Sequence, residues 1–400
     1  MAIDKKIDFG KRFGFGGLRL PILNNDQMDI DYETLDAMID KFMANGFNYF
    51  DTSYIYHGQL SEVALGKSLV ARYPRDSFLL STKMPIKFMT QKEHMEEIFE
   101  EQLQKCQVDY FDFYLVHAIS QETYDICKKW DTFEFLLKKQ EEGKFREFGV
   151  SVHDTPEFLE MLLTEHPEIS FVVLQLNYID WENPGIRSRE IYEVAVKHNK
   201  PIVVMEACKG GTLAEIPDEA VKLMKDYNPD ASVASWAYRF VGSLPGVRVV
   251  LAGMPKMEFL DDNMETFNNF KPLNEEEYKI LDQVVEIINS NTPIACTYCR
   301  YCESECPMQI AIPDNFALYN DYVRLQKDST INPVRTQAFY YASMIERGRG
   351  HASSCIKCKK CEKVCPQHLP ITQYLEEYIV PELERYDPRD DIEKDKKVDM

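Results

Sequence analysis

The sequence predicts an α/β fold, in which a closed (β/α)8 barrel of the TIM type precedes a smaller, mainly α-helical module. Three observations support this prediction. Short apolar runs alternate with amphipathic stretches up to about residue 270, the pattern of parallel strands covered by helices. No G-x-G-x-x-G leads into a helix after the first strand, since Gly14, Gly16 and Gly17 precede Leu18–Pro21. Eight of the eleven cysteines fall between Cys296 and Cys365.

The predicted strands are apolar runs bounded by turn or helix signals. They are Phe13–Leu18, Phe47–Asp51, Phe78–Lys83, Phe111–His117, Phe148–Ser151, Phe171–Leu176, Ile202–Ala207 and Val247–Leu251. Among the helix signals, Thr155 with Pro156 predicts an N-cap and a first-turn proline, and Thr90 with Glu93 predicts a capping box. Asn274–Ser290 is predicted as a further amphipathic helix. Eight strand–helix units fit a closed barrel better than an open sheet.

Composition narrows the classes of function. The 400 residues include 46 Lys and Arg against 66 Asp and Glu, a formal net charge of −20. This acidic balance argues against nucleic acid or an anionic membrane as the main partner. No apolar run approaches the ~18 residues of a membrane helix, and Met1–Lys6 lacks the apolar segment of a secretory signal. We therefore expect a soluble, cytoplasmic protein.

The cysteines form two runs of identical spacing, C-x2-C-x2-C-x3-C-P. The runs are Cys296, Cys299, Cys302 and Cys306 before Pro307, and Cys355, Cys358, Cys361 and Cys365 before Pro366. In such a run three thiolates bind one [4Fe–4S] cluster and the fourth reaches a second cluster. We therefore predict one cluster on Cys296, Cys299, Cys302 and Cys365, and another on Cys355, Cys358, Cys361 and Cys306. Structural zinc sites are the alternative, but they leave the third cysteine and the proline of each run unexplained.

The predicted organisation has three parts. Residues 1–290 form the barrel, residues 291–386 form the cluster module, and residues 387–400 form a charged tail. Between the two cysteine runs, Asn315–Gln326 and Arg335–Arg347 have the composition of helices.

Active sites of (β/α)8 barrels lie at the C-terminal ends of the strands. The residues predicted there are Asp51, Lys83, His117, Ser151, Gln175, Glu206 and Gly253, with Tyr56 on the loop after Asp51. A phenol with a pKa of ~10 is a poor proton donor at neutral pH, but a nearby ammonium lowers that pKa and a carboxylate holds the ammonium in place. An imidazole can then orient or polarise a carbonyl. Taken singly, each residue is better explained as a cap, a rim residue, a surface charge or a satisfied histidine, but together at the strand ends of one barrel they indicate a site.

Residues 10–290 resemble the aldo-keto reductase family. The matching segments are Phe50–Ser53 with Tyr56, Ser61-Glu62 with Gly66, Ser81–Lys83, Leu115–His117, Gly149–Ser151, and Gln175 with Asn177-Tyr178. The resemblance implies an oxidoreductase acting on a carbonyl or alcohol, with Asp51, Tyr56, Lys83 and His117 as catalytic tetrad and Tyr56 as general acid. The cysteine-rich module resembles two-cluster bacterial ferredoxins. The whole chain is thus similar to a ferredoxin-fused branch of the family.

The resemblance also implies a nicotinamide, NADP(H), across the barrel mouth. Its contacts would be Gly17, Ser151, Gln175, Met205, Gly253, Met254, Lys256 and Asn263. Three positions depart from the family pattern. Val152 replaces an asparagine, Met205 replaces the tyrosine that stacks on nicotinamide, and Phe259 replaces an arginine for the NADP phosphate, for which Lys256 could substitute.

A nicotinamide passes two electrons as a hydride, whereas an iron–sulfur cluster passes single electrons. Three arrangements therefore stay open. The barrel holds a flavin, or it is an NADPH-dependent carbonyl reductase with structural clusters, or a low-potential ferredoxin reduces the substrate stepwise while Tyr56 supplies protons. A fourth possibility is a non-catalytic electron-carrier subunit on a retired barrel.

Lysines are concentrated in the second cysteine run. Lys357, Lys359, Lys360 and Lys363 are opposed only by Glu362 between Cys355 and Cys365. They either compensate the negative charge of a cluster or form a docking patch for an acidic, ferredoxin-type electron carrier.

Overall fold

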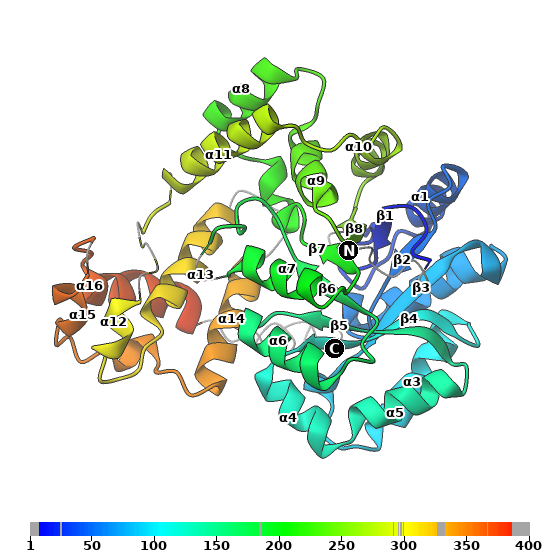
Figure 1. The fold of residues 1–400 in the computed structure, drawn as a ribbon, viewed down its shortest axis with the longest axis horizontal. Coiled ribbons are helices and arrows are strands. Elements are labelled where there is room, and N and C mark those ends of the chain that lie inside the picture. The colour runs from blue at the N-terminus through cyan, green and yellow to red at the C-terminus, as the bar shows by residue number, and fades with distance from the viewer. Residues whose placement is uncertain are drawn as a thin grey trace. The chain divides into compact units, whose positions relative to one another are not determined.

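The computed structural model describes residues 8–24, 26–183, 186–290, 292–294, 296, 298, 300–325, 333–365 and 367–385 (Figure 1). Cys299, Pro366 and the predicted charged tail at 387–400 lie outside the described residues. The chain divides into two compact units, Met1–Ala214 with Met224–Leu281 and Glu215–Leu223 with Asp282–Met400.

The first unit is a closed barrel of eight parallel strands in the order β1 to β8. The strands are β1 Phe13–Gly16, β2 Tyr49–Asp51, β3 Leu79–Met84, β4 Phe111–Ile119, β5 Phe145–Val152, β6 Phe171–Gln175, β7 Ile202–Met205 and β8 Val247–Gly253. The barrel closes where β1 pairs with β8, with Gly16 opposite Gly253. The predicted fold class and its eight strands are confirmed.

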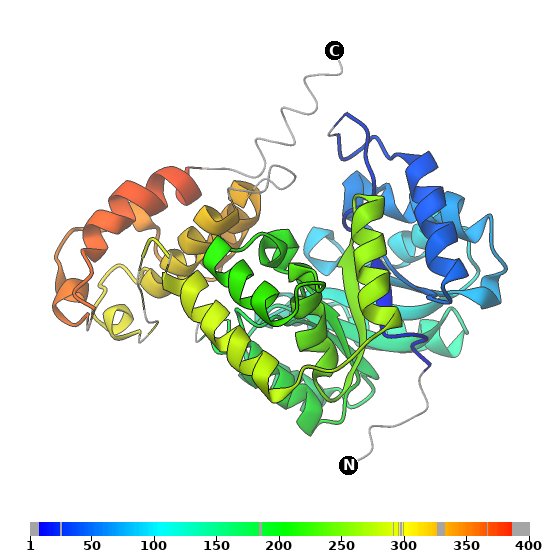
Figure 2. The ribbon, with the colours of Figure 1, turned by 90° about the horizontal axis from the view of Figure 1, so that it is seen from above.

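Helices follow the strands along the chain (Figure 2). They are α1 Tyr32–Ala44, α2 Ser61–Leu65, α3 His94–Cys106, α4 Gln121–Lys129, α5 Thr132–Glu141, α6 Pro156–Glu165, α7 Ser188–Lys197, α8 Asp218–Tyr227, α9 Val233–Ser243, α10 Met257–Asn268 and α11 Glu275–Ser290. Shorter helical turns are η1 Tyr56–Gln59, η2 Gly66–Val70, η3 Arg75–Ser77, η4 Ile86–Phe88 and η5 Lys209–Ala214.

Two of the three predicted helix starts are confirmed. The Thr155 hydroxyl accepts from the backbone N–H of Phe158 at 3.2 Å, with Pro156 in the first turn of α6. The Asn274 side chain accepts from two backbone N–H groups at the start of α11. The capping box of Thr90 and Glu93 is wrong, because α3 begins at His94 and Glu93 makes no side-chain cap bond. Backbone carbonyls of the preceding turn already accept from the first N–H groups of α3.

Aromatic side chains fill the barrel interior. The rings of Phe9 and Phe113 stack with centroids 5.0 Å apart, and the ring of Phe171 meets Phe113 edge-on at 5.3 Å. Gly149 leaves room for Phe171, since a Cβ there would lie 2.4 Å from the ring. The interior is therefore a packed core, and the strand ends are left to carry the chemistry.

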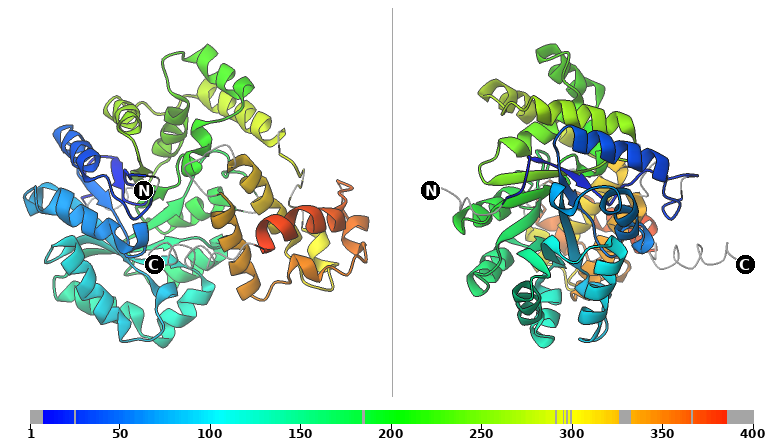
Figure 3. Two further views of the ribbon diagram at one scale, coloured as in Figure 1. Left: turned by 180° about the vertical axis from the view of Figure 1, so that it is seen from behind. Right: turned by 90° about the vertical axis from the view of Figure 1, so that its right-hand side faces the viewer.

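The cysteine-rich module is mainly helical, as predicted (Figure 3). Its elements are α12 Tyr301–Ser304, α13 Ile312–Leu325, α14 Pro333–Glu346, η6 Ala352–Ser354, α15 Lys360–Lys363, α16 Ile371–Tyr374 and η7 Leu375–Glu384. The two helices predicted between the cysteine runs correspond to α13 and α14. Phe316, Ile379 and Leu383 are fully buried in the core of this module. Across the described residues, every helix falls short of the length and apolar content that a bilayer crossing would need.

Candidate functional site

A buried ion pair lies at the C-terminal ends of β2 and β3. The Lys83 Nζ donates to the Asp51 carboxylate at 2.7 Å and to the backbone carbonyl of Thr52 at 2.6 Å. The two side chains are only 3% and 5% exposed. Burial by itself would lower the pKa of Lys83, but Asp51 and Tyr56 outweigh it and raise that pKa. The ammonium therefore stays charged at neutral pH.

The phenol of Tyr56 lies beside this ammonium. Tyr56 begins η1, directly after the β2 loop, and the Lys83 Nζ is 5.0 Å from the centroid of its ring. Burial raises the pKa of Tyr56, Lys83 opposes this effect, and the carboxylates of Asp51 and Glu206 add to it. The net direction is upward, so the phenol carries its proton at neutral pH and can donate it.

The imidazole of His117, on β4, meets the same phenol. The two rings are edge-on, with centroids 5.9 Å apart, and His117 Nδ1 lies 3.0 Å from the Ser53 hydroxyl. Burial first and the Lys83 charge second hold the pKa of His117 well below its usual value. The structure thus brings Asp51, Tyr56, Lys83 and His117 together, with a charged ammonium, a protonated phenol and a neutral imidazole.

Three of the positions predicted to contact a cofactor lie at the ends of β5, β6 and β7. The Ser151 hydroxyl accepts from the backbone N–H of Ala118 at 2.7 Å. The Gln175 side-chain amide donates to Asp180 at 3.2 Å, and Met205 pairs with Gln175 across the ladder. Ser151 and Gln175 are therefore fixed in place by bonds within the protein.

The other predicted cofactor positions lie near the β1–β8 seam and on α10. The Gly17 N–H donates to the backbone carbonyl of Asp51 at 2.7 Å. Gly253 ends β8, Met254 and Asn263 are buried, and Lys256 occupies the N-cap position of α10. Among these positions, the exposed ammonium of Lys256 and the first N–H groups of α10 suit a phosphate.

Glu206 was predicted at a strand end, but its conformation was not foreseen. Its backbone is left-handed, with φ of 56°, and its carbonyl accepts from Lys209 N–H at 2.9 Å and from the Asn177 amide at 3.3 Å. Asp180 anchors both partners, bonding the Asn177 amide at 2.8 Å and the Lys209 ammonium at 2.9 Å. This network holds the backbone of Glu206 in place. The side chain of Glu206 is exposed, and its carboxylate helps to raise the pKa of the Tyr56 phenol.

Two further residues of this end of the barrel escaped the sequence analysis. His153 follows β5, and burial lowers its pKa while Glu206 and the amide of Gln175 oppose that shift. Arg19 follows β1 and packs on Gly253, where an added Cβ would lie 3.0 Å from the Cβ of Arg19. Within the part of the chain that the structure describes, no carboxylate pairs with Arg19. The sequence alone does not show that Arg19 lies beside Gly253, because this contact depends on the pairing of β1 with β8.

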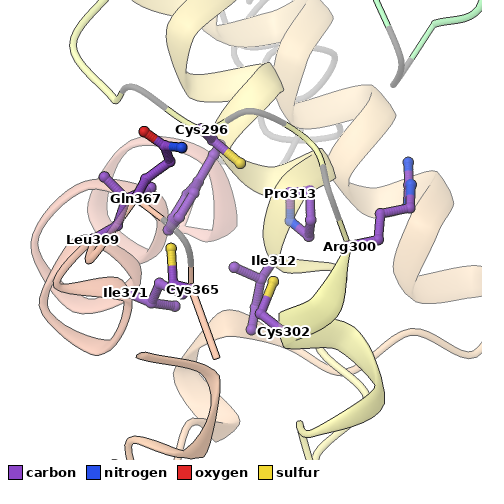
Figure 4. Close-up of a pocket in the computed structure, with 10 residues that line it drawn as sticks. Cys296, Arg300, Cys302, Ile312, Pro313, Cys365, Gln367, Leu369 and Ile371 are labelled. Carbon is purple, nitrogen blue, oxygen red and sulfur yellow. The ribbon is translucent and has the colours of Figure 1, made fainter. Parts of the chain in front are cut away.

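Two cavities of the cysteine-rich module are lined by cysteines from both runs. Figure 4 shows the first, where Cys296, Cys302 and Cys365 face a space beside Ile312. Phe316 also lines this cavity. The second is lined by four cysteines, Cys306, Cys355, Cys358 and Cys361. The fourth cysteine of each run thus lies with the described cysteines of the other run, as the spacing predicts. Thiol donors within apolar walls suit an iron–sulfur cluster.

Comparison with known families covers both units. Residues 12–286 match the model of the aldo/keto reductase family, and residues 295–371 match that of a 4Fe-4S dicluster domain. An uncharacterized oxidoreductase of Bacillus subtilis is 24% identical over 275 residues, which span 61% of this chain and 85% of that protein. L-galactose dehydrogenase of Arabidopsis thaliana is 36% identical over 110 residues, which span 26% of this chain and 34% of that protein.

Solved structures show the same barrel. The holo form of an aldo-keto reductase from Bacillus halodurans superposes with a TM-score of 0.56 at 22% identity. The match covers 72% of this chain and 94% of the Bacillus halodurans chain. An aldo-keto reductase from Klebsiella pneumoniae in complex with NADPH superposes with a TM-score of 0.53 at 20% identity. The match covers 68% of this chain and 90% of the Klebsiella chain. Because the family match spans well over half of its residues, this chain belongs to the aldo/keto reductase family of oxidoreductases and carries a 4Fe-4S domain after its barrel.

Proposed function

We propose that this enzyme reduces a carbonyl group, or oxidises the corresponding alcohol, at a tetrad of Asp51, Tyr56, Lys83 and His117. We further propose that two [4Fe–4S] clusters couple this reaction to electron transfer. The observation that supports the first proposal best is the buried ammonium of Lys83, which lies 2.7 Å from Asp51 and 5.0 Å from the ring of Tyr56.

Each side chain of the tetrad has a distinct task in carbonyl reduction. NADP(H), when bound, supplies the hydride that reaches the carbonyl carbon. The Tyr56 hydroxyl gives its proton to the carbonyl oxygen, and the resulting phenolate is stabilised by the Lys83 ammonium. Asp51 keeps that ammonium charged and in place, and neutral His117 orients the carbonyl oxygen. In alcohol oxidation the same phenolate takes the proton back.

The residues proposed to hold NADP(H) fit an anionic dinucleotide. Ser151 and Gln175 would meet the carboxamide and Met205 the nicotinamide ring, while Gly17, Gly253, Met254, Lys256 and Asn263 would meet the remainder. Arg19, which has no carboxylate partner among the described residues, adds a guanidinium beside Gly253. The NADPH complex of the Klebsiella pneumoniae relative supports this choice. A flavin in its place is the alternative that fits one-electron donors.

The proposed ligand sets are Cys296, Cys299, Cys302 and Cys365 for one cluster, and Cys355, Cys358, Cys361 and Cys306 for the other. Two clusters store two electrons, which equal one hydride. A one-electron carrier of the ferredoxin type is therefore the proposed protein partner. We place the domain boundary near residue 290, and we propose a cytoplasmic location because metal-binding cysteines of this kind belong to a reducing compartment.

Replacement of Tyr56 tests the catalytic proposal. Tyr56→Phe should lower kcat with a panel of aldehydes and ketones by about 10²-fold or more, because the proton donor is lost. Tyr54→Phe is the matched control on the same loop, since its hydroxyl donates to Glu101 at 2.9 Å instead of facing Lys83. The proposal fails if both variants turn over at the wild-type rate while their cluster absorbance is intact.

Anaerobic purification followed by cofactor extraction separates the cofactor alternatives. Flavin absorbance in the extract would indicate that the barrel holds a flavin instead of NADP(H). A flavin-free protein that oxidises NADPH upon addition of a carbonyl substrate would support the nicotinamide arrangement. For two clusters we expect about eight iron atoms and about eight sulfide ions per chain.

A further inference from the structure

The two cysteine runs share their spacing but differ in charge. Between Cys296 and Cys306, Arg300 is opposed by Glu303 and Glu305, a net charge of −1. Between Cys355 and Cys365, four lysines are opposed by Glu362, a net charge of +3. The two runs therefore carry net charges of opposite sign, in a chain whose total is −20.

The charges of the first run are largely neutralised by neighbours. The Arg300 guanidinium donates to both oxygens of Asp314, at 2.7 and 3.0 Å, and also to Glu303 at 3.0 Å. Glu303 additionally accepts from Arg349 at 3.1 Å. Only Glu305 adds a charge without such a partner in the described chain, so this run presents little attraction to a charged protein.

The lysines of the second run are only partly neutralised. Lys357 pairs with Glu376 at 2.7 Å, and Lys359 lies 3.6 Å from Glu362. Lys360 and Lys363 have no carboxylate partner among the residues that the structure describes. All four lysines are exposed, so positive charge remains available at this surface.

The same surface brings a cluster ligand and apolar side chains to the solvent. Cys358 is exposed, whereas Cys302 and Cys361 are buried. Ile356 and Val364, which lie within the second run, are 61% and 36% exposed. Exposed apolar side chains among charged ones are typical of a protein interface, and an exposed ligand lets a partner approach the cluster closely.

Charge compensation alone does not explain this arrangement. Lysines that only offset a cluster would serve equally well as partly buried groups, and both clusters would need them. Instead, among the described residues of the two runs, the lysines without a carboxylate partner lie in the second run, beside the exposed Cys358. Complementary fields speed encounter and orient it, and the acidic remainder of the chain would repel an acidic partner from other faces.

We propose that the surface of Ile356–Lys360, Lys363 and Val364, called here the lysine face, is the docking site of an acidic one-electron carrier protein. The Cys306, Cys355, Cys358 and Cys361 cluster is then the port at which one electron passes between the carrier and this chain. The reduced carrier loses the electron that the oxidised cluster gains. This inference rests on the proposed two-cluster function and adds which cluster meets the partner.

The test compares two charge changes of equal size. Lys360→Gln/Lys363→Gln removes two positive charges from the lysine face. Tyr301→Glu/Ser304→Glu adds two negative charges at the corresponding positions of the first run, where both side chains are exposed. The probe is an acidic plant-type [2Fe–2S] ferredoxin, and a basic c-type cytochrome serves as the carrier of opposite charge.

Stopped-flow electron exchange and the binding affinity of the holoprotein for the ferredoxin are measured at several salt concentrations. We expect the lysine variant to lose about tenfold in rate and affinity at low salt, with a flatter salt dependence, and the first-run variant to change less than about twofold. Reduction by photoreduced deazaflavin should be equal in all three proteins. Exchange with the cytochrome should not fall in the lysine variant.

Several outcomes would overturn the proposal. Equal losses in both variants would indicate a global charge effect, and unchanged ferredoxin affinity would remove the docking site. A shifted cluster potential with unchanged affinity would establish charge compensation instead. Iron analysis distinguishes a failure of the proposed function from a failure of this inference. A protein without clusters contradicts the proposed function. A cluster-loaded protein whose electron exchange with the ferredoxin does not depend on the lysine face contradicts only this inference.

Discussion

Lys83 and Asp51 form an ion pair of 2.7 Å that is almost completely buried and lies against the ring of Tyr56. Such a pair is costly to desolvate and costly to break, because removal of one partner leaves the other charge buried without compensation. The catalytic role proposed for this pair can therefore be tested separately from its contribution to stability.

Lys83→Met should separate these two contributions. The variant leaves the Asp51 carboxylate unpaired, so urea unfolding should show a loss of about 3 kcal/mol or more. It also removes the charge that opposes the upward shift of the Tyr56 pKa, so kcat should fall by about 10²-fold. The double variant Asp51→Asn/Lys83→Met should regain much of the stability and none of the turnover. Recovery of turnover in the double variant would contradict the role given to the ammonium.

Glu206→Gln should change the pH dependence of the reaction. Burial is the main cause of the raised pKa of Tyr56, and the Glu206 carboxylate adds to it. Without that carboxylate the pKa of the phenol falls. Because reduction requires the protonated phenol, the alkaline limb of the kcat/KM profile should move to lower pH, by less than about one unit. Glu215→Gln, an exposed carboxylate further along the loop, is the control, and an identical profile in both variants would remove Glu206 from the site.

Serine substitutions should reveal which cysteines share a cluster. Cys306 lines the cavity of Cys355, Cys358 and Cys361, so Cys306→Ser should perturb the same Mössbauer and EPR signals as Cys358→Ser. Cys365→Ser should instead match Cys302→Ser, since these two cysteines line the other cavity. Spectra in which Cys306→Ser resembles Cys302→Ser would mean that each run binds its own cluster.

Arg19→Met should weaken the binding of NADPH. A charge-assisted hydrogen bond contributes about 1.5–3 kcal/mol, so the Kd measured by fluorescence titration should rise by about tenfold or more. Arg12 lies before the opposite end of β1, where its guanidinium donates to the Gly242 carbonyl at 2.7 Å. Arg12→Met therefore serves as the control. Equal Kd values for both variants would place the phosphates of the cofactor elsewhere.

The features that were predicted correctly depend on local sequence or on fixed spacing. Strands of a parallel barrel are buried on both faces, so runs such as Val247–Leu251 are apolar throughout and can be recognised. Strand ends gather at one face of any such barrel, which is why Asp51, Lys83 and His117 could be grouped before their contacts were known. The cysteine spacing likewise predicted which cysteines line the two cavities.

The features that were missed depend on contacts between distant segments. The left-handed backbone of Glu206 follows from bonds to Asn177 and Lys209, which come together only after β6 and β7 are paired. The Thr90 prediction failed for a related reason, because backbone carbonyls took the place of the side-chain cap. Propensity cannot rank such competing acceptors without the tertiary structure.

The exchange of Cys306 and Cys365 between the two cavities has a consequence for biosynthesis. A ribosome that has finished the first run has produced only three of the four cysteines proposed as ligands of the first cluster, Cys296, Cys299 and Cys302. The missing one, Cys365, emerges only after α13 and α14. Assembly of either proposed cluster must therefore wait until the second run emerges, and a nascent chain that stalls before Cys361 can complete neither of them.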